Sequence, residues 1–205
     1  MKERNQGYGF LSIILMLFML TASCASIPEL KVIYQLPPAS AELEGKRVLL
    51  TIKDARPDKE VLGSGAKSAL SDFSGNFSLS VSQFKEAEIQ AGVYRVVGMM
   101  RECFRRRLEN EGLIPIFQES GDEPQLLIVL NEFFLDRAGR DWVFKMGYEA
   151  RLVKNGKVLS RENISGEGAR YNFSGRGAAE TVLGEIFTDS VNRLDINKLF
   201  QRAGL

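Results

Sequence analysis

The chain has 205 residues, with 27 lysines and arginines against 26 aspartates and glutamates, and it contains no histidine. This near-neutral balance lacks the concentrated basic charge that nucleic-acid binding requires, so no nucleic-acid partner is expected. The missing histidine excludes Ser-His-Asp and Cys-His catalysis and the commonest zinc ligand, which leaves carboxylate chemistry as the main enzymatic option.

The N-terminus has the order of a secretory signal. Two basic residues near the start are followed by an apolar stretch over residues 10–20 and by the small pair Ala22-Ser23, directly before Cys24. At 1.5 Å per residue the apolar stretch would cover roughly 16 Å, about half of a bilayer core about 30 Å thick. We therefore expect residues 1–23 to be a cleaved signal peptide and not a permanent membrane span.

The same segment resembles a bacterial lipoprotein signal, in which the cysteine becomes the acylated first residue of the mature protein. It departs from the usual lipobox, because Thr21 stands where leucine is common and Leu20 lies one place earlier. An ordinary cleaved signal or an uncleaved anchor is the alternative. The resemblance implies three acyl chains on Cys24, a stable attachment to a membrane surface. Ala25, in place of an inner-membrane retention aspartate, favours the outer membrane and a periplasm-facing body.

The remaining chain divides into a tether and one domain. Residues 24–45 contain three prolines and predict an extended lipid-anchored tether, in which the apolar Val32-Ile33-Tyr34 is suited to an edge strand. Residues 46–205 predict a single periplasmic domain, since about 180 mature residues are enough to bury one sizeable core.

The first elements of the domain are strands. Residues 47–53 predict a strand that ends at Asp54-Ala55-Arg56-Pro57, because proline restricts the preceding residue. The glycine- and serine-rich residues 63–76 predict a loop. Apolar residues then alternate with serines over 77–82, which is the period of a half-exposed strand.

A change to helical spacing predicts a helix over residues 86–111. Cys103 lies on its apolar stripe, and because acylation of Cys24 would leave it no disulfide partner, we interpret it as a buried small hydrophobe. Arginines gather in the last turns, where the helix dipole favours positive charge and Glu102 can pair with Arg106. Contact of these arginines with anionic lipid or glycan is the alternative.

Long strands and a second helix complete the chain. The predicted elements are strands at 113–117, 125–136, 142–152 and 158–166, a helix at 178–194 and a helical turn at 197–201. Asn155-Gly156 is the strongest hairpin signal and predicts an antiparallel meander. Together the elements predict an α+β fold, in which two amphipathic helices pack on one face of an antiparallel sheet.

These features together resemble the YajG family of bacterial lipoproteins. The likeness rests on the acylated start, on strand 48–53 running into Asp54-Ala55-Arg56-Pro57, and on the order of the later strands and helices. The resemblance implies an outer-membrane lipoprotein without an assigned activity. Only Asp54 and Arg56 carry over as a motif: the carboxylate can accept from the turn backbone, and the guanidinium suits a carboxylate or phosphate. The alternative is a self-contained lock of the turn.

Other patterns give no site. Gly63-Ser64-Gly65-Ala66-Lys67-Ser68 lacks the spacing of a phosphate-binding loop, and the acids at 119–123 lack the alternation of a calcium loop. We therefore predict no catalytic residue, metal or cofactor. The expected role is that of a non-catalytic lipoprotein that binds or scaffolds an envelope protein or glycan.

Two alternative functions remain. One is an accessory lipoprotein of an envelope machine, such as a transporter or a peptidoglycan synthase. The other is a hydrolase that works through two convergent carboxylates, which would require Asp54, Asp58 or other acids to meet in a cleft.

Overall fold

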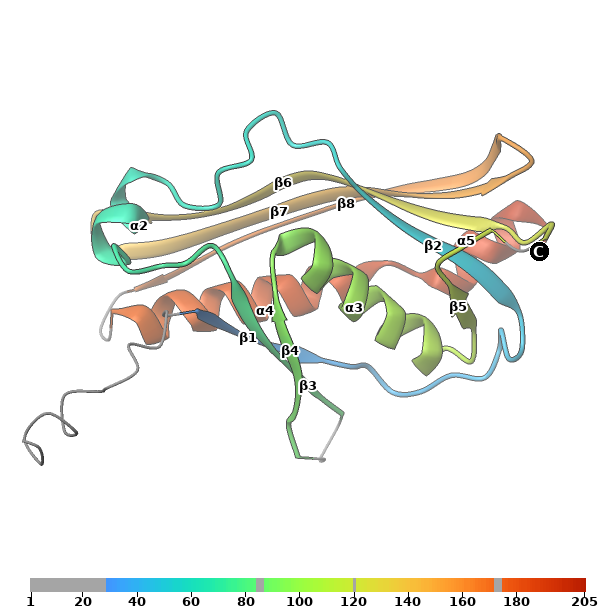
Figure 1. The fold of residues 1–205 in the computed structure, drawn as a ribbon, viewed down its shortest axis with the longest axis horizontal. Helices are drawn as coiled ribbons and strands as arrows, with labels where there is room; N and C mark the ends of the chain where they lie inside the picture. Colours follow the sequence, from blue (N-terminus) through green and yellow to red (C-terminus); the bar gives the residue numbers. More distant parts are fainter. Residues whose placement is uncertain (1–28, 84–86, 120, 172–174) are drawn as a thin grey trace, which may run out of the picture.

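A five-stranded sheet runs along the length of the molecule (Figure 1). The structure is a computed structural model that describes residues 29–83, 87–119, 121–171 and 175–205. The strand order is β5-β2-β6-β7-β8. The bounds are β2 Arg47–Asp54, β5 Ile114–Ile116, β6 Gln125–Ala138, β7 Asp141–Lys154 and β8 Lys157–Tyr171.

The strands β6, β7 and β8 form the predicted antiparallel meander. Asn155 and Gly156 both have positive φ, 52° and 72°, as a tight hairpin of this sequence requires. The prediction of a wholly antiparallel sheet is wrong at β2, which runs parallel to both β5 and β6. Seventy residues separate β2 from β6, so the connection is long enough for a parallel pairing.

A second sheet holds the chain's first strand. It consists of β1 (Leu30–Gln35), β3 (Phe77–Ser82) and β4 (Ile89–Tyr94), with β1 parallel to β3 and β3 antiparallel to β4. The alternate side chains Leu30, Val32 and Tyr34 are completely buried. The segment 24–45 is therefore not a tether throughout, because its apolar residues repeat every second position and fill the core. The edge strand predicted around residue 33 is confirmed.

Four helices accompany the two sheets in the described residues. They are α2 (Ser64–Ala69), α3 (Val96–Asn110), α4 (Arg176–Arg193) and α5 (Ile196–Ala203). The predicted second helix and the turn after it are confirmed. The helix predicted over 86–111 begins only at Val96, since Ile89–Tyr94 pairs with β3, and the predicted loop 63–76 contains the short α2.

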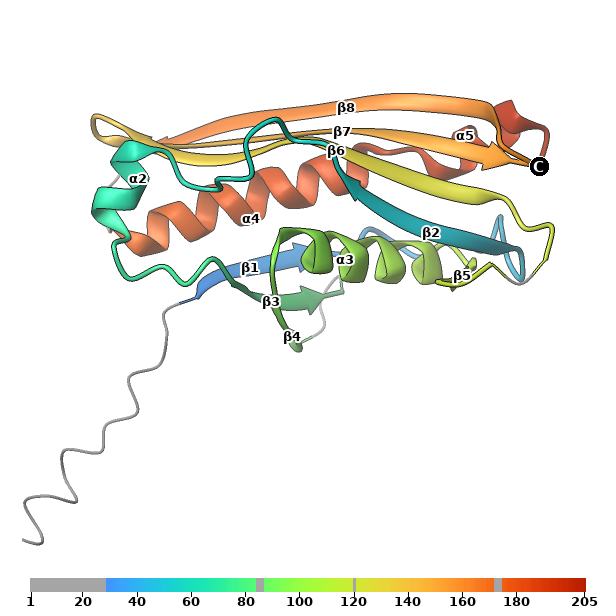
Figure 2. The same ribbon diagram turned by 45° about the horizontal axis from the view of Figure 1, so that its top comes forward.

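The core lies between the five-stranded sheet and the second sheet. Both α3 and α4 lie on the same side of the long strands, and β1 runs along the opposite side of α4 (Figure 2). Edge-to-face contacts of Phe187 on α4 with Tyr34, at 6.2 Å, and with Phe133, at 6.4 Å, join the two sheets through the helix. The α+β class is confirmed.

Within the described ranges, none of the helices combines the length and the apolar composition needed to cross a bilayer. Cys24 and the predicted signal segment lie outside the described residues.

Candidate functional site

The turn after β2 is held by a bidentate ion pair. Arg56 donates from Nε to Oδ1 of Asp54 at 3.0 Å and from Nη2 to Oδ2 at 2.9 Å, and its backbone N–H also donates to Oδ1. The remaining nitrogen, Nη1, donates to the carbonyl oxygen of Phe133 on β6 at 3.3 Å. The hydrogen bond from Arg56 lowers the pKa of Asp54 to about 2. These contacts are those of a lock that fastens the turn to the sheet.

A cavity of about 670 Å³ opens beside this lock. The turn, α2 with the loop after it, and the start of α3 each contribute to its wall. Besides Arg56, three cations line it: Lys59 pairs with Asp54, Lys67 pairs with Glu60, and the exposed Arg95 directly precedes α3. Their proximity is not evident from the sequence, because residues about thirty positions apart meet here only through the fold.

Gly63 and Gly65, at the start of α2, allow a close approach of this helix to β6. A Cβ added at Gly63 would lie 2.2 Å from Cγ of Asp136, and one added at Gly65 would lie 2.1 Å from the carbonyl oxygen of Arg137. The backbone N–H of Ala66 donates to Oδ1 of Asp136 at 3.0 Å. The carboxylate of Asp136 therefore occupies the place at the start of α2 that a phosphate would take in a phosphate-binding loop.

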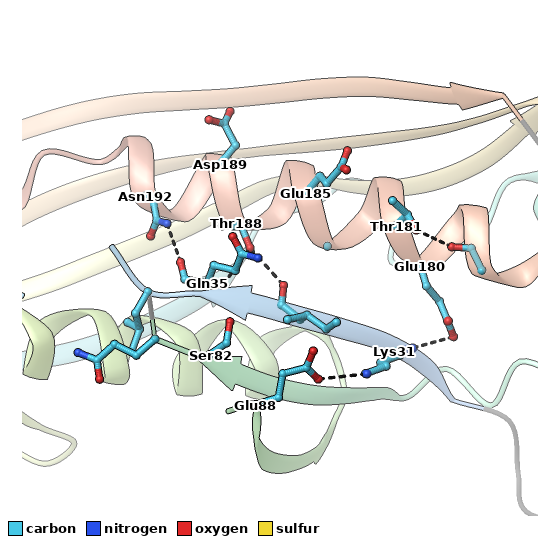
Figure 3. Close-up of a pocket in the computed structure, with 15 residues that line it drawn as sticks. Lys31, Gln35, Ser82, Glu88, Glu180, Thr181, Glu185, Thr188, Asp189 and Asn192 are labelled. Atoms are coloured by element: carbon cyan, nitrogen blue, oxygen red, sulfur yellow. Dashed lines mark hydrogen bonds and ion pairs between the residues drawn. The ribbon is translucent and has the colours of Figure 1, made fainter. Parts of the chain in front are cut away.

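A larger groove, about 970 Å³, lies between β1 and α4 (Figure 3). Along it, side chains of α4 bond to the backbone of β1. Glu180 accepts from the N–H of Lys31 at 3.0 Å, and Asn192 donates to the carbonyl of Gln35 at 2.8 Å. Between them Thr188 accepts from the N–H of Gln35 and donates to the carbonyl of Ile33.

The bonding side chains repeat every fourth residue, at 180, 188 and 192, with Gly184 in the gap, so they share one face of the helix. Open sheet edges attract other strands unless something covers them. The helix α4 therefore protects the outer edge of β1. The groove therefore marks a sheet edge whose backbone groups are already bonded to α4.

The arginines of α3 separate into two groups. Arg105 and Arg106 both bond to Glu102, as predicted for Arg106, whereas Arg101 is exposed and forms no ion pair with the described residues. Arg107 instead points inward and pairs with the buried Glu111. Cys103 is completely buried, as predicted, and burial raises the pKa of its thiol.

Acidic residues do not gather into a metal site in the described part of the chain, where no group of three or more His, Cys, Asp or Glu side chains could hold an ion. Asp54 is engaged by Arg56 and Lys59, and Asp58 accepts from the backbone N–H of Glu60. The two carboxylates named for the hydrolase alternative thus each have a local structural partner.

No protein-family model matches the chain, and no curated protein matches it in sequence. Among solved structures, a DUF330 protein from Xanthomonas campestris has a TM-score of 0.50 and 16% identity, with 87% of this chain and 96% of that chain covered. The two share a fold.

Two further solved structures are similar at lower scores. The lipoprotein GNA1162 of Neisseria meningitidis has a TM-score of 0.41 and 14% identity, with 72% of this chain and 96% of that chain covered. The protein CT253 of Chlamydia trachomatis has a TM-score of 0.47 and 8% identity, with 78% and 99% covered.

Proposed function

We propose that the protein is a bacterial envelope lipoprotein that binds or scaffolds a partner without catalysing a reaction. One observation carries the proposal: the signal-like segment ends at Cys24, and Leu30, six residues later, is already completely buried. A lipidated cysteine in that position joins a water-soluble body to a membrane surface.

The short link fixes how the body would sit. Residues 25–29 reach at most about 18 Å when fully extended, so the body lies close to the lipid headgroups. The start of β1, the start of α4 and the β6–β7 turn share one end of the molecule, whereas α5 and the β7–β8 hairpin lie at the other (Figures 1 and 2). The anchored end therefore faces the bilayer and the far end is presented to the periplasm.

The proposed location of the protein is the outer membrane. Ala25 follows the cysteine where an aspartate would favour the inner membrane, and the turn Asp54-Ala55-Arg56-Pro57 supports a YajG-like lipoprotein. An accessory role beside a transporter or a peptidoglycan synthase is the form of this proposal in which the partner is a protein. The uncovered part of β2, described below, favours that form over a glycan partner.

Mass spectrometry of the protein extracted from membranes tests the anchor. We expect a processed chain whose first residue is an acylated Cys24, and we expect Cys24→Ala to remove that modification and release the body from the membrane fraction. The body should keep its melting temperature, because the described fold starts at residue 29. Cys103→Ala is the matched control and should stay on the membrane. A processed but unmodified N-terminus in the soluble fraction would contradict the proposal.

Density-gradient separation of the two membranes tests the location. The natural chain should co-sediment with the outer membrane, and Ala25→Asp should move it towards the inner membrane. Crosslinking in intact cells, followed by purification, then separates the roles: a stoichiometric transporter or synthase component supports the accessory role. Recovery of crosslinked glycan without protein counts against it.

A further inference from the structure

The outer edge of β2 is covered over only part of its length. β5 pairs with Arg47–Leu49 and then ends, whereas β6 pairs with β2 as far as Asp54. Among the described residues, no strand lies beside residues 50–54 on the β5 side. Figure 1 shows the short β5 next to the much longer β2. Residues 50–54 of β2 thus lack a neighbouring strand on that side, although Nζ of Lys59 donates to the carbonyl oxygen of Asp54 at 3.1 Å.

Hydrogen-bond directions along β2 identify the open groups. The N–H groups of Leu49 and Ala55 donate to carbonyls at the β6 side, and Ile114 of β5 donates to the carbonyl of Lys46. Because these directions alternate along a strand, the N–H groups of Ile52 and Asp54 face the side that β5 leaves open.

The outer edges of β1 and β2 differ in how far other elements cover them. On β1, side chains of α4 bond to the outward-facing backbone groups. Beside β2 lies α3, and within the described ranges none of its side chains forms a hydrogen bond to the backbone of β2. A cavity of about 590 Å³ is lined by residues of both elements. This edge therefore has space and unpaired groups where the other has a cover.

The cavity beside β2 carries positive charge. Its α3 wall holds Arg101, Arg105 and Glu102, and the carboxylate of Glu102 is already shared by Arg105 and Arg106. Arg101 is exposed and has no ion pair in the described part of the chain. The cavity beside the Asp54–Arg56 lock is lined by Arg95, and also by Lys59 and Lys67, which pair with Asp54 and Glu60.

We propose that the open edge of β2 binds an extended, acidic segment of a partner protein as an added strand. The proposal rests on the binding role proposed above and names the class of partner. The outward-facing backbone groups within residues 50–54 supply affinity in this mode, and the arginines of α3 select acidic side chains. Phe117, 49% exposed at the end of β5, gives the segment an apolar contact.

A second copy of the chain suits this edge poorly. A two-fold pairing of β2 with itself would place the same patch on both sides of the interface. Arg101 and Arg105 of one copy would then face those of the other. Charge complementarity thus favours an acidic partner over self-association.

The test uses the processed full-length protein in detergent and two labelled, capped hexapeptides, one of alternating valine and glutamate and one of alternating valine and lysine. We expect the glutamate peptide to bind and the lysine peptide not to bind, as measured by fluorescence anisotropy. Amide hydrogen exchange at single-residue resolution should show slower exchange at Ile52 and Asp54 when the glutamate peptide is present. The amides of Thr51 and Lys53 should not change, since they already face β6.

Charge reversal provides the matched variants. Arg101→Glu should weaken binding of the glutamate peptide about threefold to tenfold. Arg161→Glu, which reverses an arginine that is also exposed but lies on β8 beside β7, should leave the affinity unchanged. The first variant lies at the proposed groove and the second does not.

Three outcomes would overturn the proposal. They are binding without slower exchange at Ile52 and Asp54, equal binding of the lysine peptide, and protection that grows with protein concentration in the absence of peptide, which would assign the edge to a second copy. All three measurements use purified protein in solution. An unmodified Cys24 would therefore leave them unchanged, and their failure would leave the anchor in place.

Discussion

Gly184 of α4 lies directly against Ile33 of β1. A Cβ added at Gly184 would lie 3.5 Å from the carbonyl oxygen of Ile33 and 3.6 Å from its nitrogen. Both values are ordinary van der Waals contacts, so there is room for one methyl group and no more. The glycine thus sets how closely the helix approaches the strand edge that it covers.

Alanine and leucine at position 184 should therefore have opposite effects. Gly184→Ala should raise the free energy of unfolding by up to about 1 kcal/mol, because alanine favours the helix and still fits. Gly184→Leu should lower it by about 1–3 kcal/mol, because the longer side chain pushes α4 away from Ile33. Urea denaturation measures both. A leucine variant as stable as the natural chain would show that the contact is looser than described.

Further along the same contact, a hydrogen bond between a hydroxyl and a side-chain amide joins β1 to α4. The hydroxyl of the buried Tyr34 donates to Oδ1 of Asn192 at 2.9 Å. Asn192→Ala should lower the free energy of unfolding by about 1–3 kcal/mol, since it leaves that hydroxyl without its protein partner. In a Tyr34→Phe background the same substitution should cost less. A double-mutant cycle by chemical denaturation measures the coupling, and simple additivity would argue against the bond.

The parts of the fold that sequence predicts well are long and periodic. The meander over β6, β7 and β8 and the helix α4 all follow sustained apolar patterns, and Asn155-Gly156 marks its hairpin because both residues adopt positive φ. β4 was missed because its apolar Ile89 and Val93 are exposed and continue a helical spacing into α3. A local pattern does not distinguish an exposed apolar edge from a helix face.

Sequence patterns do not predict which distant segments of the chain pack together. The three alternating apolar residues of β1 lie in a proline-containing stretch, and the surfaces on which they pack come from distant segments, among them α4, more than 140 residues later. The same limit applies to the candidate site. The lock of Asp54 and Arg56 could be proposed from two residues in one turn. Lys67 and Arg95, in contrast, meet at the cavity beside this lock only because the whole fold brings them there.

Arg107 of α3 points inward, and replacing it tests what its buried ion pair contributes to stability. Arg107 and Glu111 are 6% and 5% exposed and pair with each other, whereas the sequence only grouped Arg107 with the other arginines in the last turns of the helix. Arg107→Ala should lower the free energy of unfolding by about 3–5 kcal/mol, because it leaves a buried carboxylate unpaired.

Two further variants separate this effect from simple loss of charge. Replacing both partners, Arg107→Met with Glu111→Leu, should recover most of the stability, since no buried charge remains. Arg106→Ala removes a more exposed partner of Glu102 and should cost no more than about 1 kcal/mol. Thermal and urea denaturation measure all three. A double variant no more stable than Arg107→Ala would contradict this account.

Gly65 provides a counterpart to Gly184, since both are glycines within helices. A Cβ at Gly65 would meet the backbone oxygen of Arg137 at 2.1 Å, and backbone cannot move aside as a flexible side chain can. Gly65→Ala should therefore lower the free energy of unfolding by about 1–3 kcal/mol and loosen α2 from β6. The expected readouts are a lower melting temperature and faster amide exchange over residues 64–69. An effect equal to that of Gly184→Ala would show that helix propensity alone decides.

The lock at Asp54 predicts a specific dependence of stability on pH. The pKa of its carboxyl is about 2 in the folded protein, below the ordinary value of 3.8, chiefly because Arg56 donates to the charged form. A lowered folded-state pKa means that the ion pair stabilises the fold above about pH 4 and loses that effect as the pH falls towards 2. Asp54→Asn should therefore be less stable than the natural chain at pH 7 and equally stable near pH 2. The difference at pH 7 is about 1 kcal/mol, because solvent screens part of the interaction.

Arg56→Lys, which keeps the charge but loses the bidentate geometry, should show a smaller pH-dependent difference from Asp54→Asn. Denaturation of the three chains between pH 2 and 7 measures these differences, and a constant gap across that range would remove the ion pair as their cause.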